Sequence, residues 1–277
     1  MKNRIIVDSC CDLTQEMKAE MGITSVPLTM ILGDKEYCDD DSLDVADFVE
    51  QVKQYKGKVT SASPSPYSYA ESIVGCDEAF IVTLSQKLSG SYTNAVLGNR
   101  DAVDCGHKSA LVLDSKTAAA GETLIAIKLH ELLKANTPRD VIVTTIREFI
   151  DSMKTYFVLE HYTNLQNNGR LSKVTGTLIS MLNIRLIMGA DGNGEIALFQ
   201  KCRGFKQMIH HMLALIENSG KETRGENLVI SHCNNHKLAT LLKAYIEERF
   251  HFKQIYAVPM GGLSSMYVDD QGVVFAF

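Results

Sequence analysis

The 277-residue sequence contains no run of about 18 apolar residues, the length that a membrane-spanning helix requires. Only three consecutive apolar residues precede Asp8, so the N-terminus does not predict a secretory signal peptide. No cluster of lysine or arginine stands out against a formal net charge of −5. A nucleic-acid partner is therefore not expected.

The seven cysteines include no CxxC pair, and their spacing is irregular. A disulfide framework needs an even number, and a zinc site needs closely spaced ligands. Scattered thiols of this kind are typical of a reducing compartment. We therefore expect a cytoplasmic protein without a membrane span.

Apolar runs at residues 4–8, 79–84 and 109–114 predict strands, and a helical pattern follows each of them. Short connections between such elements indicate a doubly wound, mostly parallel sheet. Residues 24–32 predict one further strand, and the Ser/Pro-rich segment 60–66 predicts a loop.

The pattern changes near Tyr156. Residues 183–199 predict two strands joined by the turn ADGNGE, and helices then alternate with further strands. We expect two α/β domains. Residues 1–155 would hold the mostly parallel sheet, and residues 156–277 would form a mixed α/β sandwich.

The stretch FIVTLSQKLSGSYTNA, residues 80–95, places small hydroxyl residues between a strand and a helix. Open α/β sheets bind ligands at the carboxyl ends of their strands. Gly90 would let a ligand approach the backbone, and Ser89 and Ser91 would add hydroxyl donors beside the helix N-terminus. The turn thus predicts an anion site for a phosphate or carboxylate, although a simple serine cap of the helix explains the same pattern.

A different interpretation makes Ser89 the nucleophile of a serine hydrolase. The residues around Ser89 do not match the G-x-S-x-G elbow of such enzymes, since Lys87 stands at the first glycine position. Without a base at hand, a serine hydroxyl is a weak nucleophile. A third interpretation is a module that binds a phosphorylated metabolite at the same helix terminus.

Other polar residues could complete an anion site. The segment 60–66 offers further hydroxyls if it lies beside the Ser89 turn. Arg170 and Arg203 could each form two charge-assisted hydrogen bonds with a carboxylate, or could simply be exposed side chains.

Two other patterns are weaker. His232 and His236 are four residues apart, but Cys233 replaces the glutamate of H-E-x-x-H, and the pair spans a strand–helix junction, so a metal site is not expected. Asp8–Ser9 and Asp114–Ser115 follow two predicted strands and could line a cleft or cap helices.

Six motifs in order resemble the DegV family over residues 5–277: IIVDSCCDL, TSASPSP, LSGSYTNA, VLDSKTAAAGE, NNGRLSK and KCRGF. This family includes the fatty-acid-binding subunits of bacterial fatty acid kinase. The resemblance implies a bacterial two-domain protein with the EDD fold, which carries a lipid and is not itself an enzyme. It also implies one long-chain fatty acid as ligand, no cofactor or metal, and a kinase catalytic subunit as partner.

The resemblance also implies how the ligand is held. The acyl tail would lie in an apolar tunnel, with the carboxylate near the domain junction. Its ligands would be Ser61, with Thr60 one residue before, and Ser89 with Gly90. The two conserved family arginines would correspond to Arg170 and Arg203.

One motif of the family is missing. Its members commonly carry a histidine near the C-terminus that joins the carboxylate network, and this chain has Tyr267 or Val268 there. We therefore expect a rebuilt site with Tyr267 as a donor.

Overall fold

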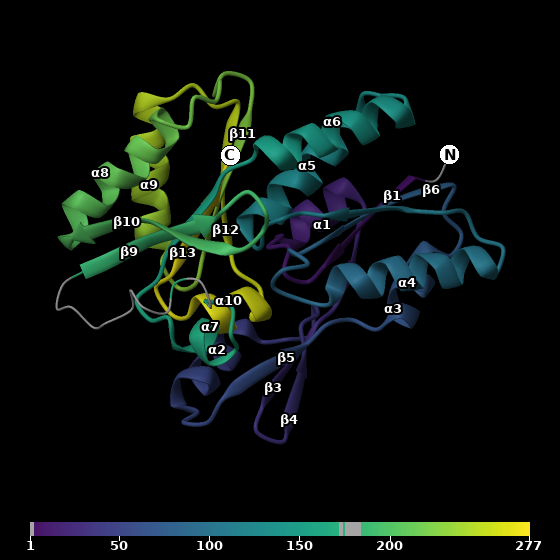
Figure 1. Cartoon of the computed structure of the whole chain (residues 1–277), viewed down its shortest axis with the longest axis horizontal. Helices are drawn as coiled ribbons and strands as arrows, with labels where there is room; N and C mark the ends of the chain where they lie inside the picture. The colour runs from purple at the N-terminus through teal and green to yellow at the C-terminus, as the bar shows by residue number, and fades with distance from the viewer. Residues whose placement is uncertain (1–2, 172–173, 175–183) are drawn as a thin grey trace.

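The computed structural model of the chain describes residues 3–171, 174 and 184–277. Sheet A is parallel, in the order β2-β1-β6-β7. It consists of β1 (Asn3–Asp8), β2 (Ile23–Val26), β6 (Glu78–Thr83) and β7 (Leu111–Asp114). Helices α3 (Pro66–Ile73) and α4 (Ser91–Asp104) cover one face, and α5 (Ala120–Lys134) and α6 (Arg139–Ser152) cover the other (Figure 1). The predicted doubly wound parallel sheet is confirmed.

Sheet C is mixed, in the order β10-β9-β8-β13-β11-β12, with β11 and β12 parallel and the other neighbours antiparallel. Its strands are β8 (Thr155–Val158), β9 (Ile184–Ala190), β10 (Ile196–Arg203), β11 (Asn227–His232), β12 (Gln254–Pro259) and β13 (Val273–Ala276). The predicted mixed α/β half is confirmed. The division at residues 155/156 falls within β8 and stays a prediction.

Both faces of β11, in sheet C, are buried. Leu228 and Ile230 of β11 pack with side chains of α8 (Gly204–Glu217) and α9 (His236–Arg249), while Val229 between them faces α5. Successive side chains of a strand point to opposite faces, so a strand covered on both sides needs consecutive apolar residues, as in the centre of β11. Helix α5 also contacts β1 and β6 and therefore lies between sheets A and C.

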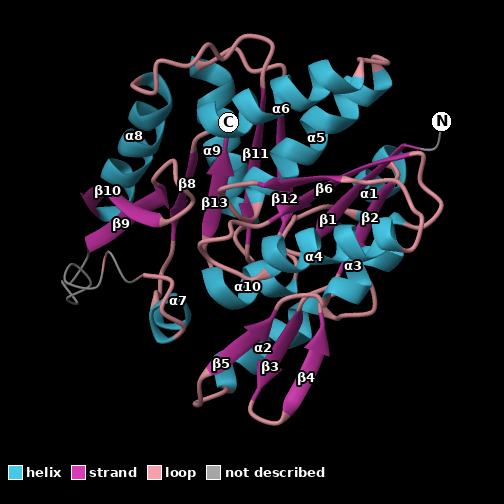
Figure 2. Ribbon diagram, turned by 45° about the vertical axis from the view of Figure 1, so that its right-hand side comes forward, coloured by secondary structure: helices cyan, strands magenta, loops and turns pink. Residues whose placement is uncertain are grey.

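Sheet B is antiparallel, in the order β4-β3-β5. It consists of β3 (Thr29–Leu32), β4 (Lys35–Cys38) and β5 (Val59–Ala62), and it lies at the foot of the molecule with α2 (Val45–Gln54) (Figure 2). Two predictions were wrong here, because residues 24–32 form β2 and β3 of different sheets and residues 60–62 belong to β5. Pro27 has no N–H for a ladder, and the next N–H, of Leu28, binds Ser9 Oγ at 3.0 Å.

The described residues include three further short helices: α1 (Gln15–Met21), α7 (Thr163–Asn167) and α10 (Gly262–Val268). Helix α10 was not anticipated, and buried carboxylates hold its N-terminus. Asp39 accepts the N–H groups of Gly262 at 2.8 Å and Leu263 at 3.1 Å, and Asp12 accepts that of Gly261 at 3.0 Å. Negative groups stabilise the positive end of a helix, and α10 thereby gains a fixed position.

All seven cysteines lie within the described residues and are free thiols, as predicted. In the same part of the chain, no helix has the length and apolar character needed to cross a membrane.

Glu122 in α5 is the least expected buried group. Its side chain is fully buried, and neither carboxyl oxygen has a hydrogen-bond partner among the described residues. Burial, followed by the nearby Asp8, raises the pKa of Glu122 well above its usual range. The folded protein therefore favours the protonated form of this side chain.

Replacement of Glu122 by glutamine tests this assignment. Glu122 has a higher pKa in the folded protein than in the unfolded chain, where it is about 4.3. Its contribution to the free energy of unfolding is therefore complete below about pH 4.3 and is lost as the pH rises toward the folded pKa. Between pH 5 and 8, we expect the free energy of unfolding to fall less steeply with rising pH in Glu122→Gln than in the wild type. The two slopes should differ by up to about 1.4 kcal/mol per pH unit. Urea unfolding at several pH values measures the slope, with exposed Glu148→Gln as the control. Equal slopes in wild type and Glu122→Gln would contradict the assignment.

Candidate functional site

A cavity of about 360 Å³ lies where the carboxyl ends of β1, β6 and β7 face sheet C. This volume is within the range of small-molecule sites, which is about 300–1,000 Å³. Aliphatic and aromatic side chains form much of its wall: Leu28, Leu84, Leu88, Phe157, Leu159, Leu165, Ile196, Leu263, Val268 and Val274. The cavity therefore suits a long apolar group.

Hydroxyl groups from distant parts of the chain line the same cavity. Ser61 comes from β5 and Tyr267 from α10, and their oxygens are 2.9 Å apart. Ser63 and Ser89 add two further hydroxyls to the lining. These groups give the apolar cavity a polar region.

The Ser89 turn has the geometry of an anion site. Ser89 Oγ accepts the Ser91 N–H at 3.2 Å, and Gly90 caps α4 without a side-chain hydrogen bond. A Cβ atom on Gly90 would lie 3.3 Å from Ser63 Oγ, so glycine lets the serine-rich segment lie close to the turn. The first N–H groups of a helix lack intrahelical acceptors and carry partial positive charge, which favours an anion here.

Hydroxyl hydrogens remain available for a ligand. The Ser89 oxygen acts as the acceptor for Ser91, so its own hydrogen can be donated elsewhere. Ser61 and Tyr267 share one hydrogen bond, which uses one of their two hydroxyl hydrogens. Ser89 and the Ser61–Tyr267 pair therefore each keep one hydroxyl hydrogen that a ligand in the cavity can accept.

Arg170 lies beside this region and lines the cavity. Its Nε donates to the Leu88 carbonyl at 3.0 Å, a second nitrogen donates to the Asn168 carbonyl, and the guanidinium carbon is 6.0 Å from the centre of the Tyr267 ring. The guanidinium thus adds positive charge between the Ser89 turn and α10. Ser172 and Lys173 of the same motif lie outside the described residues.

Two of the predicted ligand residues do not line the cavity. Thr60 precedes Ser61 on β5, and successive side chains of a strand point to opposite faces. Arg203 is exposed at the end of β10, immediately before α8. Of the six predicted residues, the structure brings together Ser61, Ser89, Gly90 and Arg170.

Ser91 points away from the cavity, contrary to expectation. Its hydroxyl donates to Asp8 Oδ2 at 2.6 Å and lies 2.5 Å from the Tyr69 hydroxyl, which must then donate to Ser91. Asp8 also accepts the N–H groups of Leu84 and Cys10. Burial raises the pKa of Asp8, against the lowering effect of the Ser91 hydrogen bond. These buried contacts fix the start of α4 on the side that faces away from the cavity.

Three further pairs of polar residues lie near the site or were candidates for it. Asp114 accepts the N–H groups of Gln86 and Lys116 and so stabilises a turn. The His232 and His236 rings are 5.7 Å apart, and no metal-binding group of three ligands occurs in the described residues. Thr117, between β7 and α5, and Thr155 of β8 have hydroxyls 2.8 Å apart in the cavity wall. They were missed because no local pattern links segments so far apart in the chain.

Comparison with known proteins identifies the family. A family model described as "Uncharacterised protein, DegV family" matches residues 2–277. The chain belongs to the DegV family. A DegV domain-containing protein of Streptococcus pneumoniae is 32% identical over 99% of this chain and 98% of its own length.

Solved structures of other DegV proteins have the same fold. A DegV protein of Ruminococcus gnavus, refined with vaccenic acid, has a TM-score of 0.94 at 34% identity and covers 99% of both chains. The Streptococcus pneumoniae Fatty Acid Kinase (Fak) B3 protein, loaded with linoleic acid, has a TM-score of 0.91 at 31% identity and covers 100% of this chain and 99% of its own.

The opposite orientations of Ser89 and Ser91 give a stability test. Ser91→Ala leaves the buried Tyr69 hydroxyl without its partner and removes one of the hydrogen bonds to Asp8, and we expect the free energy of unfolding to fall by about 1–3 kcal/mol. Ser89→Ala removes only a local N–H contact, and we expect a loss of about 1 kcal/mol or less. Urea unfolding of the two variants measures the difference. A larger loss in Ser89→Ala would contradict the geometry described here.

Proposed function

We propose that this DegV protein binds one long-chain fatty acid noncovalently, with the acyl chain in the apolar cavity and the carboxylate beside Ser61, Ser89 and Tyr267. The observation that carries the proposal is that two hydroxyl hydrogens remain available in the lining of a largely apolar cavity, one on Ser89 at the N-terminus of α4 and one on the Ser61–Tyr267 pair. In this scheme Arg170 supplies positive charge. Thr60 and Arg203 take no direct part, since neither lines the cavity.

The energetics agree with this ligand. Burying a carboxylate without partners costs several kcal/mol or more, so hydrogen-bond donors at the cavity are essential. Each buried CH₂ group contributes about 0.8 kcal/mol, which adds up to strong binding for a long chain. A phosphorylated metabolite would gain little from the apolar wall, so the cavity favours a lipid.

We further infer that the protein acts as a carrier that presents the fatty acid to a kinase, which would phosphorylate the carboxylate to an acyl phosphate. The similarity to the Fak B3 protein supports this partner. Ala62 and Gly90, at the proposed carboxylate end, are exposed, so a partner could reach that end. The free cysteines support a cytoplasmic site of action.

The serine hydrolase alternative is not favoured by the geometry. A nucleophilic serine needs a general base within hydrogen-bond reach. The hydrogen bond of Ser89 Oγ is to a backbone N–H, and no histidine occurs among the described residues that line the cavity. A fluorophosphonate probe that labels Ser89 in folded protein would favour this alternative.

The identity of the ligand can be tested on the purified protein. We expect organic extraction followed by mass spectrometry to yield a long-chain fatty acid, in a ratio near one per chain. Protein stripped of lipid should bind added vaccenic acid. Folded protein that yields no fatty acid and binds none would overturn the proposed function.

Substitutions at the hydroxyls test the position of the carboxylate. Hydrogen bonds to charged groups contribute about 1.5–3 kcal/mol, so Ser61→Ala and Ser89→Ala should each weaken vaccenic acid binding about tenfold or more. The double variant should bind still more weakly and remain folded. Titration calorimetry measures affinity, with Ser109→Ala, which lies outside the cavity lining, as the control. Unchanged affinity in the double variant would contradict the assignment.

A further inference from the structure

Helix α10 carries Tyr267 into the cavity but is too short to hold its own position. It spans seven residues, and isolated helices shorter than about 12 residues are marginal in water. The direction of the Tyr267 hydroxyl therefore depends on tertiary contacts at the two ends of α10. Asp12 and Asp39 hold the N-terminal end, as described above.

The C-terminal end of α10 leads into a strained turn. Asp269 and Gln271 have φ values of 64° and 67°, in the left-handed region that costs a non-glycine residue of order 1 kcal/mol or more. Such conformations persist only where surrounding contacts enforce them. The turn lies two to four residues after Tyr267. Contacts that fix the turn therefore also fix the C-terminal end of α10.

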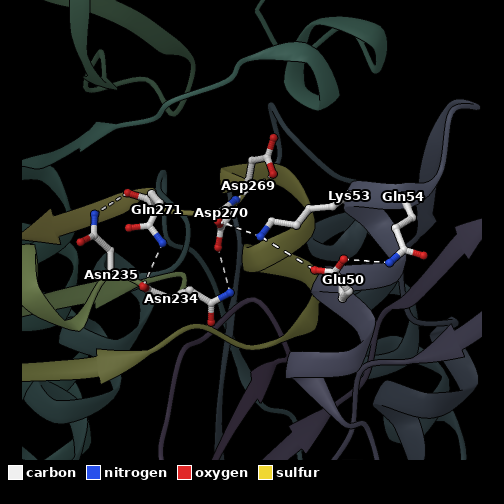
Figure 3. Close-up of polar contacts among 8 residues, drawn as sticks. All are labelled: Glu50, Lys53, Gln54, Asn234, Asn235, Asp269, Asp270 and Gln271. Carbon is white, nitrogen blue, oxygen red and sulfur yellow. Dashed lines mark hydrogen bonds and ion pairs between the residues drawn. The ribbon is translucent and has the colours of Figure 1, made fainter.

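A cluster of polar contacts holds this turn (Figure 3). Asp270 Oδ2 is 2.9 Å from Lys53 Nζ, and its Oδ1 accepts a hydrogen bond from Asn234 Nδ2 at 2.9 Å. Gln271 Nε2 donates to the Asn234 carbonyl at 3.1 Å, and Asn235 Nδ2 donates to the Gln271 carbonyl at 2.6 Å. We call the Lys53–Asp270 ion pair, with the Asn234 contact, the clasp.

The clasp connects α2, which packs on sheet B, to the end of α10. Sheet B and α10 also meet at the Ser61–Tyr267 hydrogen bond. Lys53 belongs to α2, whose Phe48 and Val52 pack in one apolar cluster with Val59 of β5, while Leu263 and Met266 of α10 complete that cluster. Tyr267 packs against the same cluster. The clasp thus fixes α10 to α2, and α2 lies on the sheet that carries Ser61.

We propose that Lys53 is a positioning residue for the carboxylate site, which acts by holding Asp270 so that the Tyr267 hydroxyl stays directed at Ser61. This inference rests on the proposed function, and it assigns a binding role to a residue that does not line the cavity. The clasp adds to backbone hydrogen bonds that hold the turn, from the Gln271 N–H to the Cys233 carbonyl at 2.9 Å and from the Cys233 N–H to the Gly272 carbonyl at 3.0 Å.

The predicted effect is modest because Lys53 and Asp270 are partly exposed, at 38% and 23% of their side-chain surface. Ion pairs of this kind contribute about 0.2–1 kcal/mol, which corresponds to about a 1.4- to 5-fold change in affinity. Lys53→Met should weaken vaccenic acid binding by that factor, whereas Lys53→Arg should keep it. A reversed pair, Lys53→Glu with Asp270→Lys, should recover part of the loss.

The decisive experiment is a double-mutant cycle between Lys53 and Tyr267, measured as vaccenic acid affinity by calorimetry. If Lys53 acts through Tyr267, Lys53→Met should weaken binding in the wild type but have no further effect in Tyr267→Phe. Lys253→Met, which breaks a 2.6 Å ion pair with Glu131 elsewhere on the surface, is the matched control and should leave affinity unchanged.

The outcomes separate this inference from the proposed function. No binding of vaccenic acid by the wild type would overturn both. Binding by the wild type, with Lys53→Met either without effect or equally harmful in the Tyr267→Phe background, would overturn the role of Lys53 alone. A loss that disappears in the Tyr267→Phe background would support it.

Discussion

The hydrogen bond between Ser61 and Tyr267 is the contact on which the site depends. It joins residues that are 206 positions apart and brings a strand of sheet B to the helix that connects β12 and β13 of sheet C. Both hydroxyls line the cavity, and the Ser89 turn completes the polar region from sheet A. The site therefore forms only when all three sheets have taken their places.

The fold uses two kinds of helix N-terminus. At the N-terminus of α10, the N–H groups of Gly261, Gly262 and Leu263 already donate to the side chains of Asp12 and Asp39, which fix the helix. The N-terminus of α4 is capped by Gly90 without a side-chain hydrogen bond, and it lies at the cavity. Because one terminus is already occupied by protein and the other is accessible, an incoming carboxylate is directed to α4.

Much of this arrangement could be predicted from local sequence patterns. The alternation of strands and helices predicts sheet A, and its carboxyl edge then places the Ser89 turn at a ligand site. Arg170 was a candidate as an anion-binding side chain, the family resemblance added Ser61, and both line the cavity. The inward direction of Ser91 could not be predicted, since it depends on Asp8 and Tyr69 beneath α4. Helix α10 depends on Asp12 and Asp39, and the clasp depends on Lys53 and Asn234. These partners come from distant segments, and no periodicity of the sequence reveals such contacts.

The location of the bound carboxylate tests the account most directly. A crystal structure with a long-chain fatty acid that carries bromine on its terminal carbon would locate both ends of the ligand. The account predicts the carboxylate within hydrogen-bond distance of the Ser61 and Ser89 hydroxyls, with the bromine signal inside the cavity among apolar side chains. A bromine signal beside Ser89, or a carboxylate outside the cavity, would contradict it.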